Sequence, residues 1–329
     1  MSALTRNRAL GTIPNDIMVE YYGQRSVGGA GLIVTEGTLV SRQGTEWPHA
    51  PGIWDEEQIA GWKKIVDQVH ANGSYIYCQL WHVGRVAHPD APQQKLSGKP
   101  TAVEDPWTIV AQFKQAAINA KEAGFDGVEL HGANGYIITQ FLDNTANQRT
   151  DQWGGSIENR ARFGLEVLKA MVEVFGENVA LKVSPAGGYN DVGMPLQETL
   201  DTFNYFISEA DKLGLAYITL VRYIPATDVE FDGKKRATAH DVLESYRGAV
   251  KNAKLFLNAS VLPEEGAELV SKGKIDGIFI GFNWITHPDL AKRVQNGKPL
   301  NNIPDIPHLQ GAKDDSALSV GYTDYPTAQ

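Results

Sequence analysis

Short apolar runs recur along the chain, and each is followed by polar or glycine-rich residues. Seven of these runs are candidate strands: residues 30–36, 74–81, 125–132, 179–185, 215–221, 254–260 and 276–282. Continuous apolar runs of this length are typical of strands that are buried on both faces of a parallel sheet. The pattern therefore predicts a mainly parallel sheet.

The segments between the runs carry apolar residues at helical spacing, which predicts amphipathic helices. Four apolar stripes are marked by Trp62 and Val66, Phe113 and Ala117, Phe163 and Val167, and Phe203 and Ile207. Gly124, Gly214 and Gly273 fall at turns from helix to strand, where a left-handed residue commonly ends a helix. Strict alternation of strand and helix predicts an α/β fold, a (β/α)₈ TIM barrel.

The missing eighth strand belongs at the start of the chain, where only the segment MSALTR precedes the first helical pattern at Pro14. Either this lead-in strand is shortened, or these few residues complete the ring. An open, doubly wound sheet is the alternative, but no GxGxxG motif follows a strand. We expect one domain over residues 1–329, with a polar C-terminal segment at 311–329 that returns to the active-site face.

Composition limits the classes of partner. The 329 residues are 42% hydrophobic and 21% charged, which is ordinary for a globular protein. A net charge of −9 argues against nucleic acid or an anionic membrane as partner. The single cysteine, Cys78, excludes an internal disulfide framework, so the cytoplasm is the expected compartment.

Polar and aromatic residues gather at the predicted C-terminal ends of the strands, where barrels of this class build their active sites. They are Thr5, Thr35, Glu36, Gln79, Trp81, His82, His131, Asn134, Tyr136, Lys182 and Ser184. The set holds hydrogen-bond donors, one cation and aromatic rings, but no cluster of carboxylates for a metal, and we do not count Glu129 among the inward-facing groups. We expect a site for a planar, polar organic group. The lone Lys182 leaves a Schiff-base aldolase open as an alternative.

Several motifs occur in a fixed order along the chain: QLWHVGR at 79–85, GFDGVELHGANGY at 124–136, TDQWGGSIENR at 150–160 and GYTDYP at 321–326. Together they resemble the old yellow enzyme family, in its classical branch. The resemblance implies an FMN-dependent ene-reductase on a (β/α)₈ barrel, reduced by NADPH or NADH in a ping-pong scheme. Its substrates would be small α,β-unsaturated carbonyls or nitroalkenes. A flavin-pocket isomerase or a non-redox barrel is the further alternative.

The resemblance also implies roles for individual residues. His131 and Asn134 would donate hydrogen bonds to the substrate oxygen, and Tyr136 would protonate Cα after hydride transfer from flavin N5 to Cβ. Cofactor contacts would come from Thr5, Gly37, Gln79, Lys182, Ser260, Gly281 and Phe282. The substrate side would be lined by Trp81, Trp47 and Tyr322, together with His131 and Asn134.

The chain departs from the family pattern at the cofactor phosphate. The family uses a glycine-rich turn after strand seven and a Gly-Arg pair after strand eight, whereas this chain has Ala259-Ser260-Val261 and Gly281-Phe282. Backbone N–H groups and a helix N-terminus could still hold the phosphate, with a hydroxyl from Ser260, so we expect FMN to bind. Arg222 or Lys234 could replace the missing arginine. The loop after HVGR, over residues 88–106, is also short. We expect the protein to be a monomer or a homodimer.

Overall fold

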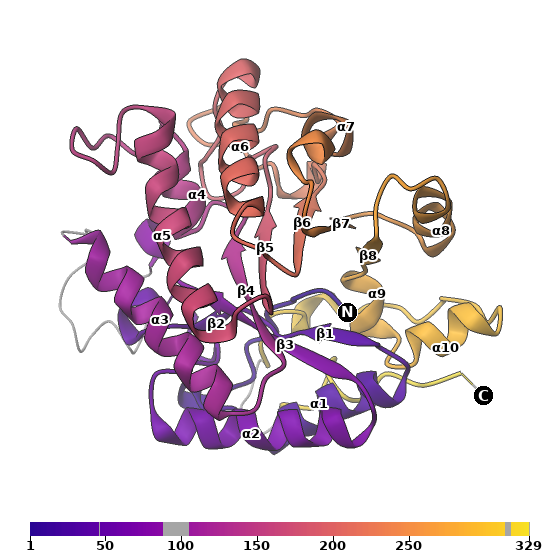
Figure 1. The fold of residues 1–329 in the computed structure, drawn as a ribbon. Coiled ribbons are helices and arrows are strands. Elements are labelled where there is room, and N and C mark those ends of the chain that lie inside the picture. The colour runs from indigo at the N-terminus through magenta and orange to yellow at the C-terminus, as the bar shows by residue number, and fades with distance from the viewer. Residues whose placement is uncertain (46, 88–104, 313–316, 329) are drawn as a thin grey trace.

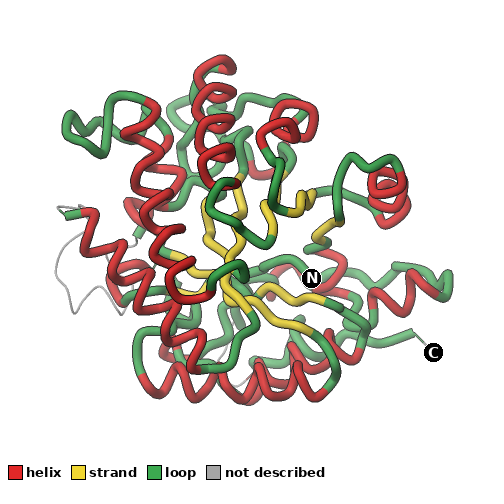
Figure 2. Tube along the Cα trace, viewed as in Figure 1, coloured by secondary structure: helices red, strands yellow, loops and turns green. Residues whose placement is uncertain are grey.

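The computed structural model describes residues 1–45, 47–87, 105–312 and 317–328, with strands at the centre and helices around them (Figures 1 and 2). The strands are β1 (Leu32–Val34), β2 (Thr38–Leu39), β3 (Tyr75–Trp81), β4 (Gly127–Gly132), β5 (Val179–Val183), β6 (Tyr217–Val221), β7 (Lys254–Asn258) and β8 (Gly277–Phe279). All pairings between them are parallel, in the order β1-β3-β4-β5-β6-β7-β8, with β2 also beside β3. This order lacks the reversal of a doubly wound sheet, so the predicted barrel class is confirmed.

The first two residues lie between β1 and β8, where Figure 1 also marks the N-terminus. The amino group of Met1 donates to the carbonyl of Leu32 at 2.7 Å, and Val34 N–H donates to Met1 at 3.0 Å. On the other side, Ser2 N–H donates to the carbonyl of Ile280 at 2.9 Å. Of the two expectations for the eighth strand, the structure therefore favours completion of the ring by the first residues.

Ten α-helices lie in the described residues. They are α1 (Asp16–Val27), α2 (Glu56–Ala71), α3 (Pro106–Glu122), α4 (Ile137–Leu142), α5 (Ile157–Phe175), α6 (Leu196–Asp211), α7 (Val242–Tyr246), α8 (Pro263–Ser271), α9 (Phe282–Thr286) and α10 (Leu290–Gln295). The four predicted stripes fall on α2, α3, α5 and α6. Asp55 and Gln58 form a capping box at the start of α2. Gly124, Gly214 and Gly273 have φ of +91°, +74° and +63°, as the helix-ending turns require.

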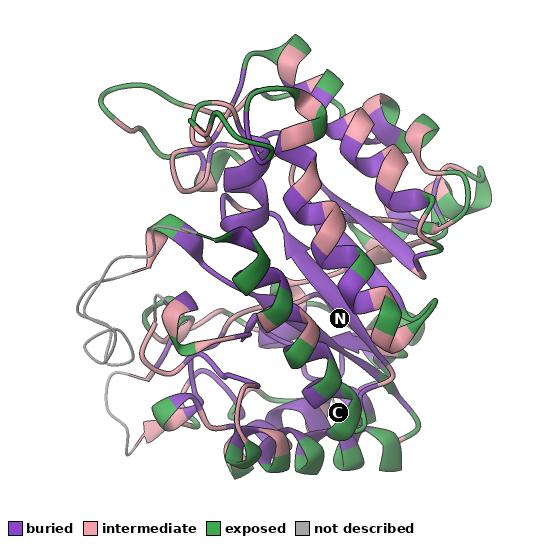
Figure 3. Cartoon of the chain, turned by 60° about the vertical axis from the view of Figure 1, so that its left-hand side comes forward, coloured by how far each residue is buried: buried purple, intermediate pink, exposed green. Residues whose placement is uncertain are grey.

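The central strands are buried on both faces, and the helices turn one buried face toward them (Figure 3). Inside the barrel, Tyr77, Ala180, Tyr217 and Phe279 pack into a small apolar cluster, which we call the floor. Gln79 lies two positions after Tyr77 on β3, and Lys182 lies two positions after Ala180 on β5. Glu129 of β4 is paired in register with Gln79. Because strand residues alternate between faces, this polar layer lies directly above the floor.

Two expectations from the sequence fall partly outside the described residues. The short loop after HVGR includes residues 88–104, and the polar C-terminal segment includes residues 313–316. In the described part of that segment, the backbone carbonyls of Val320 and Gly321 accept hydrogen bonds from Arg8 and Arg6. The C-terminal segment is therefore held against the start of the chain. No described helix is long and apolar enough to cross a membrane.

Candidate active site

A cavity of about 450 Å³ opens at the C-terminal ends of β5 to β8. Residues 2–4 form part of its wall, and Lys182 and Asn134 line one side. Ser260, Gly281 and Phe282 line another side, after β7 and β8. The structure therefore brings five predicted site residues to one cavity. We call the side at Lys182 and Asn134 the ring end and the side at Ser260 the phosphate end.

The polar layer above the floor contains one basic and one acidic side chain, Lys182 and Glu129. Lys182 is buried and donates to the hydroxyl of Ser2 at 3.2 Å. Burial lowers the pKa of Lys182, and the carboxylate of Glu129 opposes that shift. Glu129 is buried as well, and its Oε1 accepts from the side-chain nitrogen of Gln79 at 2.7 Å. Burial raises the pKa of Glu129, while the Lys182 cation and the Gln79 hydrogen bond act against this.

Glu129 was therefore wrongly left out of the inward-facing groups. It precedes His131 by two residues on β4, so both side chains point to the same face of the strand. The period of a strand would have identified it. Gln79, predicted to contact the flavin, does not line the cavity but is tied to Glu129.

His131 is held as a neutral donor. Its Nδ1 accepts the N–H of Ala133 at 3.3 Å, which leaves the ring proton on Nε2. Burial, with a further contribution from the Lys182 cation, lowers the pKa of His131 to about 3. The imidazole is therefore uncharged at neutral pH, and its Nε2–H is a fixed neutral hydrogen-bond donor.

Asn134 lies in a tightly held turn after β4. Its φ is +59°, a left-handed conformation that asparagine tolerates better than most residues. Its N–H donates to the hydroxyl of Ser184 at 2.7 Å, and its carbonyl accepts from the Asn190 side chain at 3.0 Å. With both backbone groups bonded, the residue is fixed while it lines the cavity.

Tyr136 and Trp81 stand beside His131. Tyr136 immediately precedes α4, and its ring centroid lies 4.9 Å from Trp81 and 5.1 Å from His131, edge-on to both. Trp47 packs against Trp81, with ring centroids 5.7 Å apart, and the predicted substrate contacts of both residues remain predictions. Tyr189, whose ring centroid is 6.5 Å from that of Tyr136, extends this aromatic group. Tyr189 is not among the predicted site residues, although its position after the end of β5 was a signal.

Thr5 and Gly37 lie next to this aromatic group. A Cβ on Gly37 would stand 2.7 Å from Cε3 of Trp81 and 3.3 Å from Oγ1 of Thr5. Packing against the indole therefore explains the glycine without reference to a cofactor. The predicted flavin contacts of Thr5 and Gly37 remain predictions.

Tyr322 lies elsewhere. It is fully buried and stacked on Tyr21, with centroids 4.1 Å apart, and the guanidinium groups of Arg6 and Arg8 lie over its ring at 5.2 and 5.1 Å. It does not line the cavity, so the structure does not place it on the substrate side as expected. The GYTDYP motif instead anchors the C-terminal segment to the N-terminal one.

The phosphate end has a different character. Ala259 and Ser260 have φ of +74° and +52°, unusual for residues with a Cβ. Neither suggested replacement for the missing arginine lines the cavity: Arg222 is bonded to both carboxylate oxygens of Glu265 at 3.1 and 2.5 Å, and Lys234 is exposed.

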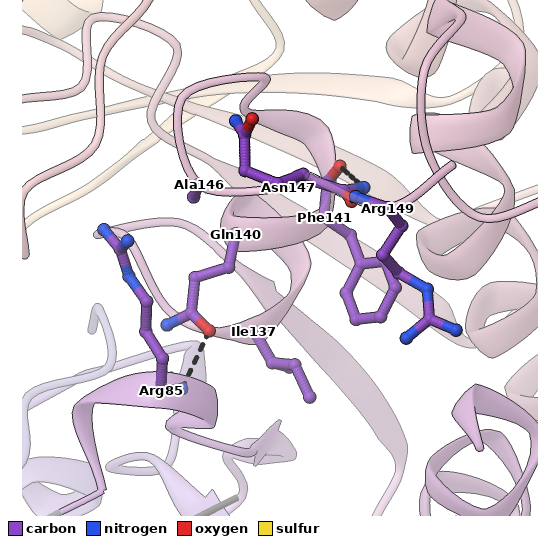
Figure 4. A pocket seen from close by; sticks show the side chains of 8 residues that line it. Arg85, Ile137, Gln140, Phe141, Ala146, Asn147 and Arg149 are labelled. Atoms are coloured by element: carbon purple, nitrogen blue, oxygen red, sulfur yellow. Dashed lines mark hydrogen bonds between the residues drawn. The ribbon is translucent and has the colours of Figure 1, made fainter. Parts of the chain in front are cut away.

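A second, smaller pocket of about 170 Å³ is lined by Arg85, Gln140 and Asn147, among other residues (Figure 4). The Gln140 side chain accepts from Arg85 N–H at 2.9 Å and donates to the carbonyls of Val83 and Gly135 at 3.0 and 2.8 Å. Gln140 therefore ties the loop after β3 to the turn that carries Asn134. This region holds the site in place.

The ring end fits a flavin. It offers the buried amine of Lys182, which has one described hydrogen bond, to Ser2, and the amide of Asn134. The neutral imidazole of His131 is in register with Lys182 across β4 and β5. Lys182 and Asn134, which line the cavity, would hold the polar edge of the cofactor and its ligand. The predicted contacts of Gln79 and His131 remain predictions. A planar, polar heterocycle suits this set because each of its edges would meet a fixed donor.

Comparison with known proteins agrees with this chemistry. Residues 1–301 match the family model described as the NADH:flavin oxidoreductase / NADH oxidase family. The chain is 37% identical to 12-oxophytodienoate reductase 7 of Oryza sativa subsp. japonica, covering 99% of this chain and 90% of that protein. It is 38% identical to chanoclavine-I aldehyde reductase of Penicillium roqueforti, over 99% and 91%.

Solved structures agree with the sequence matches. Morphinone reductase superposes with a TM-score of 0.86 and 34% identity, covering 100% of this chain and 91% of its own, and it has also been solved in complex with tetrahydroNAD. The chain therefore belongs to the NADH:flavin oxidoreductase / NADH oxidase family, the old yellow enzyme family of FMN-dependent oxidoreductases.

Proposed function

We propose that this protein reduces the activated C=C bond of small α,β-unsaturated carbonyl compounds, and of nitroalkenes, with NADPH or NADH as the source of electrons. The observation that carries this is the neutral His131 donor, which is edge-on to Tyr136 and in register with the cavity-lining Lys182. The turn after the same strand places Asn134 in the cavity wall. Family membership favours this reaction over the Schiff-base aldolase that Lys182 alone left open.

His131 and Asn134 act on the substrate oxygen. Negative charge develops on that oxygen as the β-carbon is reduced, and two fixed donors in a dry site stabilise it. The removal of one such donor costs about 10²–10³-fold in rate in other enzymes. Since His131 is neutral, it donates a hydrogen bond without giving up its proton.

Tyr136 supplies the proton to the α-carbon. A phenol has an ordinary pKa of about 10, so it is protonated at neutral pH and can act as a general acid. Bound FMN, once reduced, supplies the hydride to the β-carbon. Trp81 fixes the position of the phenol through its edge-on contact.

The nicotinamide reductant and the substrate use the same cavity in turn. The complex of morphinone reductase with tetrahydroNAD supports nicotinamide binding at this fold. We propose a cytoplasmic enzyme that works as a monomer or a homodimer. The single buried thiol, Cys78, fits a reducing compartment.

Two measurements on the FMN-loaded protein test this function. Addition of 4-hydroxybenzaldehyde should produce a long-wavelength charge-transfer band, because the phenolate oxygen would bind to His131 and Asn134. His131→Gln and Asn134→Ala should weaken the band, whereas His70→Gln, a surface control on α2, should leave it unchanged. Absence of enone-dependent oxidation of both NADPH and NADH would refute the proposal.

A further inference from the structure

We propose that the cavity anchors its flavin through the ring and the ribityl chain and makes little use of the terminal phosphate, so that riboflavin binds almost as well as FMN. This rests on the proposed function only in taking a flavin as the ligand. It concerns the phosphate end, around Ser260 and Phe282.

The first argument is charge. A phosphate monoester carries about −1.5 to −2 charges at pH 7 and binds tightly where cations or charge-assisted hydrogen bonds meet it. Among the described residues that line the cavity, Lys182 is the only cation. It lies in the polar layer at the ring end, paired in register with His131 across β4 and β5. A phosphate near Ser260 therefore meets neutral groups.

The second argument is the ion pair beside the phosphate end. Arg222 follows Val221, which lines the cavity, but both of its terminal nitrogens bond to Glu265 of α8. The guanidinium group holds the pKa of Glu265 below its ordinary value, so this carboxyl stays ionised at neutral pH. The charge of Arg222, the cation next to Val221 in the chain, is therefore already paired with the Glu265 carboxylate.

Helix α8 adds more negative charge. Glu264 and Glu265 occupy its first turn, directly after the Ser260–Leu262 turn that lines the cavity. Carboxylates at this position satisfy the positive end of the helix dipole, a role that a bound phosphate would otherwise take. They would also repel a dianion.

The third argument is the apolar rim of the phosphate end. Val221, Ile224, Val261, Leu262 and Phe282 line it, and Leu262 and Phe282 are 60% and 48% exposed. The polar side chains nearby are the neutral Ser260, Asn258 and Asn283, and Asn258 already donates to the carbonyl of Phe279 at 2.7 Å. Such a rim suits the neutral end of riboflavin better than a dianion.

The test is the affinity of flavin-free protein for FMN and for riboflavin, measured by quenching of flavin fluorescence. We expect the two dissociation constants to agree within about tenfold, which corresponds to about 1.4 kcal/mol. We also expect FMN affinity to change little with added NaCl, because salt screens exposed ion pairs. FMN binding more than about a hundredfold tighter than riboflavin would overturn the proposal.

Two variants sharpen the test. Phe282→Arg places a cation on the rim and should favour FMN over riboflavin by about tenfold or more relative to Phe282→Leu, the uncharged control. Glu265→Gln, which releases Arg222, should raise FMN affinity several-fold more than Glu264→Gln, which removes the same charge one residue earlier. An unchanged ratio of FMN to riboflavin affinity in Phe282→Arg would contradict the placement of the phosphate.

The outcomes for this inference and for the proposed function are distinguishable. Similar affinities without enone reduction would support the inference and refute the function. Selective FMN binding together with enone reduction would refute the inference and support the function. Failure of both flavins to bind would refute both.

Discussion

The two ends of the cavity differ in how their side chains are held. At the ring end, Lys182, Glu129 and Gln79 are buried, and each has a named polar or charged partner inside the barrel. At the phosphate end, Ser260 and Phe282 are exposed, and the nearby guanidinium group of Arg222 is bonded to Glu265. One end is organised for hydrogen bonding and charge, and the other is apolar and open.

The difference follows from the elements that carry each end. The ring end is built on β3, β4 and β5, whose parallel pairing sets every inward side chain in register. The phosphate end is built on the turns after β7 and β8, where Ala259 and Ser260 adopt left-handed conformations. Side chains on strands are positioned more tightly than side chains on loops, so chemistry belongs at the ring end.

The largest expected effect is at Tyr136. Tyr136→Phe should slow enone reduction by about 10²–10⁴-fold, the usual contribution of a general acid, because it removes the proton donor. Reduction of the bound flavin by NAD(P)H should stay close to wild type. Stopped-flow measurement of the two half-reactions separates them, with Tyr75→Phe, an exposed tyrosine on β3, as the control. Equal loss in both half-reactions would exclude Tyr136 as the donor.

Effects of intermediate size on flavin affinity should distinguish the ring end from the phosphate end directly. Lys182→Met should weaken flavin binding by about tenfold, or about 1.4 kcal/mol, and make the flavin harder to reduce, since the cation favours the anionic reduced form. Ser260→Ala, at the phosphate end, should change flavin affinity by only about twofold. Fluorescence titration and redox titration provide the measurements. A larger loss of flavin affinity in Ser260→Ala than in Lys182→Met would show that the phosphate end contributes more to binding than the ring end.

The smallest effect concerns the pH dependence of the free energy of unfolding and the exclusion of water from the ring end. Burial lowers the pKa of His82 to about 4, and that of His131 is lowered to about 3. Between pH 6.5 and about 4 the unfolded chain binds protons that the folded protein does not, so the free energy of unfolding decreases as pH falls. Each histidine should contribute about 1–2 kcal/mol between pH 6.5 and 5.

Urea unfolding at pH 7 and pH 5 provides the measurement. The difference between the two free energies should be smaller in His82→Gln, which keeps an acceptor for the N–H of Gly84 that now bonds His82 at 3.0 Å. Phenol binding to the wild-type site should show no titration of His131 between pH 5 and 8. A phenol affinity that changed with a pKa near 6.5 would show that the ring end is wetter than its burial indicates.

Much of the fold and of the ring end could be predicted from the chain. The seven apolar runs became β1 and β3 to β8, and the helix-ending glycines have the expected positive φ. His131, Asn134 and Tyr136 are close together because one strand end and its turn carry all three. The omission of Glu129 was a mistake about strand parity.

The sequence by itself determined the alternation of strands and helices and the donors at the end of β4, because these depend on the periods of local structure and on nearby residues. Tertiary structure decided which partners Arg222 and Tyr322 take: Glu265 lies 43 residues from Arg222, and Tyr21 lies far away in the chain. It also decided that Met1 and Ser2 bridge β1 and β8. Side-chain partners distant in sequence are selected by packing, which local patterns do not encode.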